Sequence, residues 1–274
     1  MSQAATSVLD RILAETRAQV EQRKRERPLT VDREGIARAG RERSFRDALA
    51  GEGMAVIAEF KRRSPSAGAL SASSPEGEQP DLGQVVSAYE RGGAAAVSVL
   101  TEGPNFSGSL DDLRSARERC SLPLLRKDFI VDPYQLREAL EAGADAVLLI
   151  VAALTAAELA SLHAGARALS LDVLVEVHDR EELHTALAIG AEIIGVNNRD
   201  LRDFSVDVAR TEALMDDMPD ATIVVSESGI AEPEQVRRLH DRGVSAVLVG
   251  EMLMRSADPA AAVRALTAWR REMI

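Results

Sequence analysis

The stretch PLLRKDFIVDPYQ, residues 123–135, places Arg126, Lys127 and Asp128 directly after a short apolar run. Charged side chains at the end of a buried strand are costly unless they are paired or used. Lysine is one of the side chains that can serve in general acid–base catalysis. The stretch therefore predicts that Lys127 takes part in chemistry.

Chemically distinctive side chains also follow the other short apolar runs of the chain, and only the run LLIVAAL, residues 148–154, offers nothing ionisable. In chain order they are Glu59, Lys61, Ser64 and Ser66, then Thr101, Glu102, Asn105 and Phe106, then Lys127 and Phe129, then Glu176 and His178, then Asn197, Asn198, Arg199 and Asp200, then Ser226, Glu227, Ser228 and Gly229, and finally Gly250 and Glu251. Residues two apart on a strand share a face, so Glu59 with Lys61, and Lys127 with Phe129, are expected to point the same way. Lysines, carboxylates, an amide and an arginine converging on one cavity would form a general acid–base site for an anionic substrate.

The segments SESGI, residues 226–230, and VGEML, residues 249–253, place glycines where a backbone can approach a ligand closely. A glycine at a turn is unremarkable by itself. Two of them after the last two strands of a parallel barrel indicate a phosphate site built from backbone N–H groups.

The elements that must position these residues alternate regularly along the chain. Short apolar runs, which we expect to be strands, cover 55–60, 95–100, 123–127, 146–151, 172–177, 193–197, 222–227 and 246–250. Helical patterns lie at 83–91, 109–119, 132–142, 155–169, 179–189, 206–215, 232–241 and 258–270. Four units repeat one phrase, RGGAAAVSV, EAGADAVLL, AIGAEIIGV and DRGVSAVLV, in which a glycine ends a helix in the left-handed conformation before a buried strand. Eight such units predict an α/β protein with a (β/α)8 TIM barrel.

Two segments fall outside this repeat, at 6–25 and 44–50, and both have helical spacing of apolar residues. We therefore expect a helical extension, residues 1–50, packed on the bottom or flank of a barrel formed by residues 51–274. The basic run at 23–27 is interpreted as a solvated helix end rather than a nucleic-acid site. The Ser-, Pro- and Gly-rich segment 69–83 is expected to be a mobile loop after the first strand.

Composition limits the function further. The chain has 274 residues and a net charge of −11, which argues against nucleic acid or an acidic membrane as a partner. No run reaches the length of a membrane helix, and the N-terminus has no apolar signal core. The single cysteine, Cys120, fits packing in a protein of a reducing compartment, so we expect the protein in the cytoplasm. The four histidines show no metal-ligand spacing, so metal binding has little support.

The sequence resembles the indole-3-glycerol phosphate synthase family over nearly its whole length. The resemblance rests on VIAEFKRRSPSAG, GGAAAVSVLTE, FSGSLDDL, LPLLRKDFIVDPYQ, GADAVLLIVAAL, LVEVHDREEL, IGVNNRDLRDF, SESGI and AVLVGEMLM. The sequence departs from the family in one place, the loop after SPSAG, which is longer and carries no basic residue between Arg63 and Arg91. The length of this loop suggests a mobile lid.

The resemblance implies a cofactor-independent carboxy-lyase of tryptophan biosynthesis. Its small phosphorylated substrate would be 1-(2-carboxyphenylamino)-1-deoxyribulose 5-phosphate, and its products indole-3-glycerol phosphate, carbon dioxide and water. The implied catalytic residues are Lys127, Glu176, Glu59, Lys61, Asn197 and Ser228. The implied substrate contacts are Phe106 and Phe129 on the aromatic ring, with Arg199, Glu227 and Ser64, while Ser228, Gly229, Gly250 and Glu251 would bind the phosphate.

Three alternatives keep the barrel and change the function. Lys127 could form a Schiff base, as in class I aldolases. The chain could be the sister barrel, phosphoribosylanthranilate isomerase, although we can place no matching acid–base pair for it. It could also be an inactive barrel kept as a binding partner, which the intact set of candidate residues disfavours. The sequence does not distinguish a monomer from a weak dimer, and it does not assign each lysine or glutamate to a step.

Overall fold

The computed structural model describes residues 7–28, 43–51, 53–64, 68–70, 81–200 and 205–267. Ser66, most of the predicted 69–83 loop and the outer ends of the first and last predicted helices lie outside these ranges. Among the described helices, none is both long and apolar enough to cross a bilayer.

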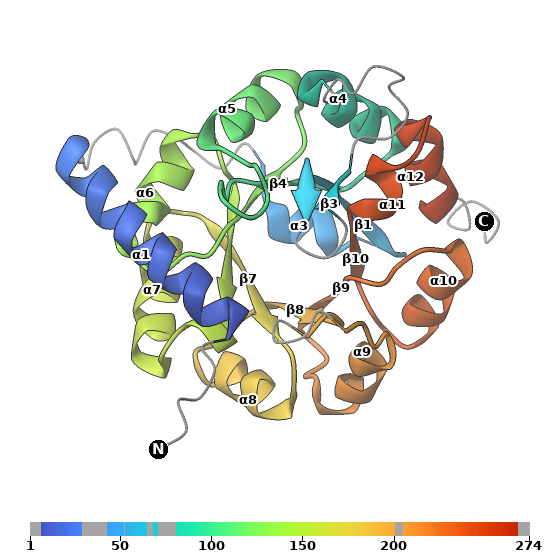
Figure 1. Ribbon diagram of the computed structural model, residues 1–274. Helices are drawn as coiled ribbons and strands as arrows, with labels where there is room; N and C mark the ends of the chain where they lie inside the picture. The colour runs from blue at the N-terminus through green and yellow to red at the C-terminus, as the bar shows by residue number, and fades with distance from the viewer. Residues whose placement is uncertain are drawn as a thin grey trace.

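A closed barrel of parallel strands forms the centre of the molecule (Figure 1). Its strands are β1 (Ala55–Phe60), β4 (Ala96–Leu100), β5 (Leu124–Lys127), β6 (Ala146–Ile150), β7 (Asp172–Val177), β8 (Ile193–Asn197), β9 (Ile223–Glu227) and β10 (Ala246–Val249). Neighbours in the chain are neighbours in the barrel, and β1 closes the ring by pairing with β10. The predicted (β/α)8 barrel is therefore confirmed, with strand bounds that differ from the predicted ones by at most one residue.

Helices surround the barrel and connect successive strands (Figure 1). They are α4 (Leu82–Gly92), α5 (Leu110–Arg119), α6 (Pro133–Glu141), α7 (Ala156–Ala168), α8 (Arg180–Ala188), α9 (Ala209–Leu214), α10 (Pro233–Asp241) and α12 (Pro259–Thr267), with short helical turns η1 (Val151–Ala153), η2 (Met215–Asp217) and α11 (Glu251–Met254). The glycines predicted to end four of these helices all have positive φ: Gly93, Gly143, Gly190 and Gly243. This conformation is accessible to glycine without the steric cost that a Cβ would add.

Helix α9 and several very short elements differ from the predictions. Helix α9 begins at Ala209 rather than at 206, because Val206 pairs with Arg199 in an isolated bridge and the Asp207 carboxylate accepts the Ala209 N–H. The turn α11 and the two-residue strands β2 (Arg63–Ser64) and β3 (Gly68–Ala69) were not predicted. Elements of two to four residues are too short to produce a periodic pattern.

Strand alternation separates two apolar layers. Ile57, Leu125 and Leu174 belong to the cluster inside the barrel, whereas their neighbours Val56 and Leu124 pack in the layer between strands and helices. Side chains two positions further along the inward series reach the carboxyl end of the barrel. The fold therefore aims Glu59, Lys127 and Glu176 into the barrel mouth; for Glu59 and Lys127 this is the direction that their spacing predicts.

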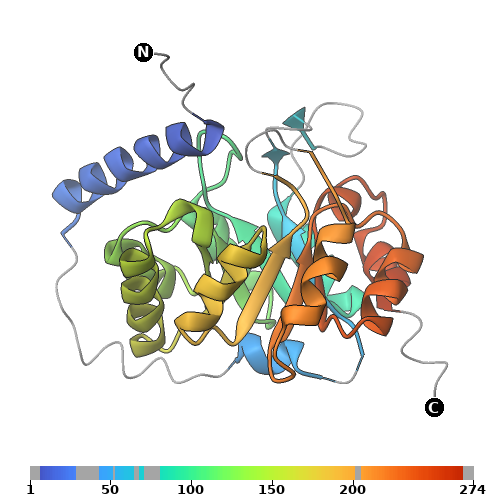
Figure 2. The same ribbon diagram turned by 90° about the horizontal axis from the view of Figure 1, so that it is seen from below.

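Helix α3 (Phe45–Leu49) closes the opposite end of the barrel (Figure 2). Its Phe45 and Leu49 side chains are fully buried in the interior cluster. The Arg46 N–H donates to the Asp172 carboxylate at the start of β7 over 3.0 Å. This segment of the predicted extension thus supplies the floor of the barrel.

Leu49→Ala is expected to destabilise the protein by about 2–5 kcal/mol, because it leaves a cavity at the floor that neighbouring strands can fill only in part. The matched control is Asp47→Ala in the same helix, whose side chain is exposed and whose loss should cost at most about 1 kcal/mol. Urea unfolding measures both. Equal losses for the two variants would show that α3 does not depend on interior packing.

Helix α1 (Val8–Glu26) lies against α6 and η1, at the end of the barrel opposite α3 (Figures 1 and 2). The basic side chains of its C-terminal run form ion pairs with carboxylates of the barrel domain and are not only in contact with solvent. Arg23 pairs with Glu138 at 2.7 Å, Lys24 with Asp132 at 2.9 Å, and Arg27 with Glu141 at 2.9 Å. The interpretation of this run as a solvated helix end missed these carboxylates, because no local pattern links helices more than a hundred residues apart.

Candidate functional site

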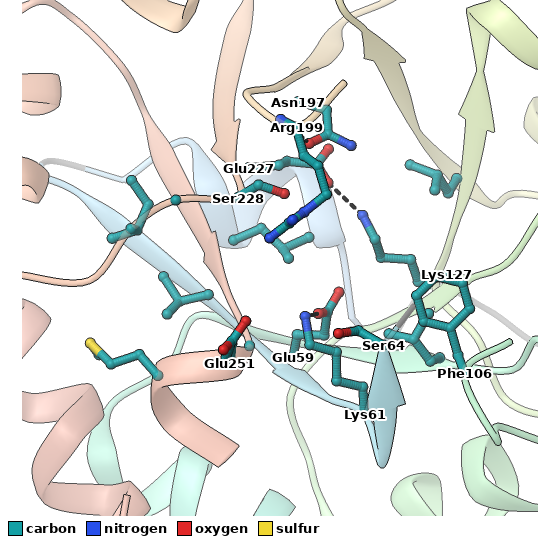
Figure 3. Close-up of a pocket in the computed structure, with 18 of the residues that line it drawn as sticks. Glu59, Lys61, Ser64, Phe106, Lys127, Asn197, Arg199, Glu227, Ser228 and Glu251 are labelled. Atoms are coloured by element: carbon teal, nitrogen blue, oxygen red, sulfur yellow. Dashed lines mark hydrogen bonds and ion pairs between the residues drawn. The ribbon is translucent and has the colours of Figure 1, made fainter. Parts of the chain in front are cut away.

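A pocket of about 520 Å³ opens at the carboxyl ends of the strands (Figure 3). The catalytic, substrate-binding and phosphate-binding residues that the family resemblance implies all line it: Glu59, Lys61, Ser64, Phe106, Lys127, Phe129, Glu176, Asn197, Arg199, Glu227, Ser228, Gly229, Gly250 and Glu251. Leu148 and Ile150 of β6 give the wall that has no ionisable group. The structure thus brings together in one cavity residues that were selected separately at strand ends.

Lys127 extends from the end of β5 toward carboxylates on the opposite wall (Figure 3). Its Nζ lies 2.5 Å from Glu227 Oε2 and 3.5 Å from Glu176 Oε2. Burial alone would lower the pKa of Lys127, but Glu227, Glu176 and Glu59 together outweigh burial and raise that pKa above its ordinary value. Lys127 is therefore held as an ammonium ion with a proton to donate.

Glu227 occupies a position that a glycine makes available. A Cβ at Gly195 on β8 would lie 2.1 Å from Glu227 Oε1, so only glycine leaves room for this carboxylate. The same oxygen is buried without a hydrogen-bond partner. Burial raises the pKa of Glu227 to about 7, although Lys127 opposes the shift. Glu227 can therefore gain or lose a proton near neutral pH.

Gly195→Ala is expected to displace the Glu227 carboxylate from Lys127 and to lower turnover while the protein remains folded. About tenfold is the expected loss, since the general acid stays but its counterion moves. Gly103→Ala is the control, because a Cβ there meets nothing closer than 3.8 Å. Steady-state kinetics with both variants measure the effect, and wild-type turnover in Gly195→Ala would show that the placement of Glu227 is unimportant.

Glu176 is contacted through both carboxylate oxygens. Its Oε1 accepts a hydrogen bond from Asn197 Nδ2 at 3.0 Å and lies 3.5 Å from His178 Nε2, while Oε2 faces Lys127. Burial alone would raise the pKa of Glu176, but Lys127, His178 and the Asn197 amide hold that pKa below its ordinary value. Glu176 is therefore an ionised carboxylate and a competent general base.

Glu59 and Lys61 form a second acid–base pair across the pocket, with Lys61 Nζ 2.8 Å from Glu59 Oε1 (Figure 3). The buried Tyr89 hydroxyl donates to the Glu59 carbonyl oxygen at 3.1 Å and so fixes the end of β1. Ser64, on β2, also lines the pocket near this pair. The predicted shared direction of Glu59 and Lys61 is confirmed.

Phe106 and Phe129 give the pocket aromatic surface. The loop that carries Phe106 is held by Glu102, whose carboxylate accepts the backbone N–H groups of Asn105 at 2.8 Å and Phe106 at 3.0 Å. Burial raises the pKa of Glu102, while those hydrogen bonds oppose the shift. Glu102 lines the pocket too, so it both shapes the aromatic wall and borders the substrate space.

The ends of β9 and β10 form the predicted phosphate region. Ser228 and Gly229 both adopt positive φ, 65° and 78°, and a serine in this conformation is uncommon. At the end of β10, a Cβ on Gly250 would lie 2.4 Å from Glu59 Oε1. Arg199 extends toward the centre of the pocket from the β8 loop (Figure 3). Compact backbone beside a cation is an arrangement suited to an anionic group.

Arg126, the neighbour of Lys127, points to the other side of β5. Its side chain is 1% exposed and pairs with Asp128 at 2.8 Å and Glu138 at 3.4 Å. Arg126 also donates to the Gln135 carbonyl oxygen at 2.7 Å. The charged triplet therefore divides, with Lys127 facing the pocket and Arg126 holding the loop and helix that follow.

Sequence reasoning missed several members of the site. Arg255 and Ser256 line the pocket after α11, and Arg255 pairs with Glu251 at 3.1 Å. They follow a turn that was not predicted, so nothing indicated that they return to the pocket. His178 was interpreted as a loop or cap residue and does precede α8, but its contact with Glu176 went unpredicted. Its spacing of two from Glu176 was the available indication.

Comparison with solved structures supports the fold. Thiamine phosphate pyrophosphorylase from Pyrococcus furiosus superposes with a TM-score of 0.58 and 17% identity, covering 78% of this chain and 94% of that chain. A structure described as native KDPGal gives a TM-score of 0.56 and 18% identity, covering 79% and 94%. At such identities the likeness concerns the barrel alone.

Sequence comparison is more specific. The family model for indole-3-glycerol phosphate synthase matches residues 9–266. Indole-3-glycerol phosphate synthase 2 of Streptomyces coelicolor is 46% identical over 261 residues, covering 95% of this chain and 99% of the relative. The Azospirillum brasilense indole-3-glycerol phosphate synthase is 44% identical over 267 residues, covering 96% and 100%. With its barrel and polar pocket, the chain belongs to the indole-3-glycerol phosphate synthase family, the carboxy-lyases of tryptophan biosynthesis.

Proposed function

We propose that the pocket closes the indole ring by general acid–base catalysis, with Lys127 as the first acid. The observation that supports this role is the ammonium group of Lys127, held between Glu227 and Glu176 on the pocket wall. The substrate is the arylamino-deoxyribulose phosphate of the family. Its ring carbon attacks the ketone carbon of the sugar chain, and Lys127 protonates the ketone oxygen as the new bond forms.

Carbon dioxide leaves next, and its loss restores the aromatic ring. The remaining hydroxyl group must then depart as water, with removal of a proton from the adjacent methylene carbon. We assign the proton removal to Glu176, because the structure holds this carboxylate ionised beside Lys127. The Glu59–Lys61 pair lies across the pocket and can hold or exchange protons with these groups.

Substrate orientation follows from the shape of the pocket. Phe106 and Phe129 offer the aromatic ring a face, while Lys61 faces the carboxylate or phosphate. Asn197 orients the reacting chain through its contact with Glu176. Ser228 and Gly229, with Gly250 and Glu251 at the end of the neighbouring strand β10, bind the phosphate mainly through their backbone, and Arg199 adds a positive charge.

A Schiff-base mechanism on Lys127 is the alternative, and the electrostatics disfavour it. A nucleophilic lysine must lose its proton, which desolvation or a neighbouring cation favours. The carboxylates around Lys127 raise its pKa instead. Borohydride treatment in the presence of substrate distinguishes the two mechanisms, because the acid role predicts no covalent adduct. The free thiol of the buried Cys120 suits a reducing compartment, and we propose the cytoplasm.

The direct test is a fluorescence assay of the purified protein with the arylamino-deoxyribulose phosphate, without added metal or cofactor. Indole emission that requires both protein and substrate is the expected result. A folded protein that gives no product would overturn the proposed reaction and leave only a phosphate-binding barrel. Inorganic phosphate should inhibit competitively if the β9 and β10 ends bind the phosphate group.

A further inference from the structure

The proposed reaction takes up one proton from solution in each turnover. The substrate carboxylate is an anion, and it leaves as neutral carbon dioxide. The ketone oxygen gains two protons before it departs as water, and one proton returns from the methylene carbon. The acids and bases of the pocket therefore finish each cycle one proton short, and solvent must replace it. The inference below rests on this proposed function.

His178 lies where a replacement proton could pass through the wall of the barrel. Its Nε2 is 3.5 Å from Glu176 Oε1, and its Nδ1 is 3.0 Å from Glu182 Oε2 on α8. Nε2 is buried and has no hydrogen-bond partner. Glu182 also accepts the His178 backbone N–H at 2.7 Å, which fixes the imidazole between the two carboxylates.

Glu176 connects this imidazole with the general acid. One of its oxygens faces His178 and the other faces Lys127, each at 3.5 Å. A carboxylate can accept a proton at one oxygen and release it from the other. Exposure rises outward along the series, with Glu176 at 2%, His178 at 11% and Glu182 at 19% of the side chain. The series therefore leads from the buried site toward solvent.

We propose that His178 is a positioning residue that passes the replacement proton from Glu182 and solvent to Glu176, and through Glu176 to Lys127. In each transfer the donor loses one proton and the acceptor gains one, and no covalent bond to carbon changes. Solvent supplies the proton. One proton is needed in each turnover because the substrate carboxylate, an anion, leaves as neutral carbon dioxide. His178 itself does not touch the substrate.

The charges around His178 suit this role at neutral pH. Burial alone would lower the pKa of His178, but Glu182 and Glu176 raise that pKa above its ordinary value, and Arg210 on α9 opposes them. The imidazolium form is therefore retained to higher pH than for a free histidine. The rate of proton supply should fall as the pH rises through the pKa of His178, because its protonated form is then lost.

The test compares His178→Gln with His184→Gln, a change at an exposed histidine of α8. For His178→Gln we expect kcat to fall by about tenfold with KM unchanged, since binding contacts remain and proton transfer slows. The solvent deuterium isotope effect on kcat should increase. The part of the decrease in kcat at high pH that follows deprotonation of His178 should disappear. Added imidazole should raise kcat in a concentration-dependent way. His184→Gln should match the wild type throughout.

Two results would overturn the proposal. Wild-type kcat in His178→Gln would mean that the proton enters through the mouth of the pocket. A lowered kcat with an unchanged isotope effect, an unchanged pH profile and no response to imidazole would mean that His178 only supports the fold. Absence of indole product from the wild-type protein would instead reject the underlying reaction, so the two failures are distinguishable.

Discussion

Lys127→Ala is expected to reduce kcat by about 10²–10⁴-fold, the range typical of a lost general acid. Without the ammonium group, negative charge builds up on the ketone oxygen with no proton to neutralise it, and Glu227 and Glu176 would raise the barrier further. Substrate should still bind, because the aromatic wall and the phosphate region are unchanged. Indole fluorescence measures turnover, and quenching or calorimetric titration measures binding.

The control for Lys127→Ala must account for the buried carboxylates that it leaves unpaired. Removing one partner of a buried ion pair destabilises a protein strongly. The double variant Lys127→Met with Glu227→Gln removes both charges of the closest pair and should recover stability without recovering turnover. Near-normal turnover in either variant would exclude Lys127 as the acid.

Glu176→Gln is the second variant for which we expect a large effect. The rate of indole formation should fall by about 10²–10⁴-fold. The amide cannot take the methylene proton, so dehydration should slow more than the earlier steps. Ring closure and decarboxylation still have Lys127, whose closest partner, Glu227, remains at 2.5 Å. We therefore expect labelled carbon dioxide to appear faster than indole in a single turnover.

Glu181→Gln, an exposed change in the first turn of α8, is the matched control and should release the two products together at the wild-type rate. If Glu176→Gln lost carbon dioxide and indole to the same degree, Glu176 would act at or before decarboxylation. If it retained normal rates of both, another group would remove the proton.

The architecture could be predicted from sequence because the strands are short, mainly apolar runs and four of the helices end at a recognisable glycine. Strand ends such as Glu59 and Lys127 could be assigned to one cavity because all parallel strands of a barrel finish on the same side. Alternation then identified the inward residues. What these rules do not describe is the short turn α11, which carries Arg255 back to the pocket.

Local sequence patterns could not predict the contacts that support the site. Arg126 is charged and lies on a strand, so its burial depends on Glu138, a helix residue that is itself bound by Arg23 of α1. His178 reaches Glu176 only because Glu182 holds its backbone and ring. These contacts depend on how distant segments pack together and on the direction in which each side chain points. Both are determined by the packing of the whole molecule.

The seam between β1 and β10 has a consequence for how the protein is made. The pairs Ala55–Ala246 and Ala58–Val249 join the first and last barrel strands, and Glu59 and Gly250 follow directly on either side of them. On a ribosome, β1 lacks its partner on this side until β10 has been synthesised. A chain released before the last strand would lack one wall of the pocket. Formation of the pocket therefore requires β10, and the appearance of activity during refolding would report closure of the ring.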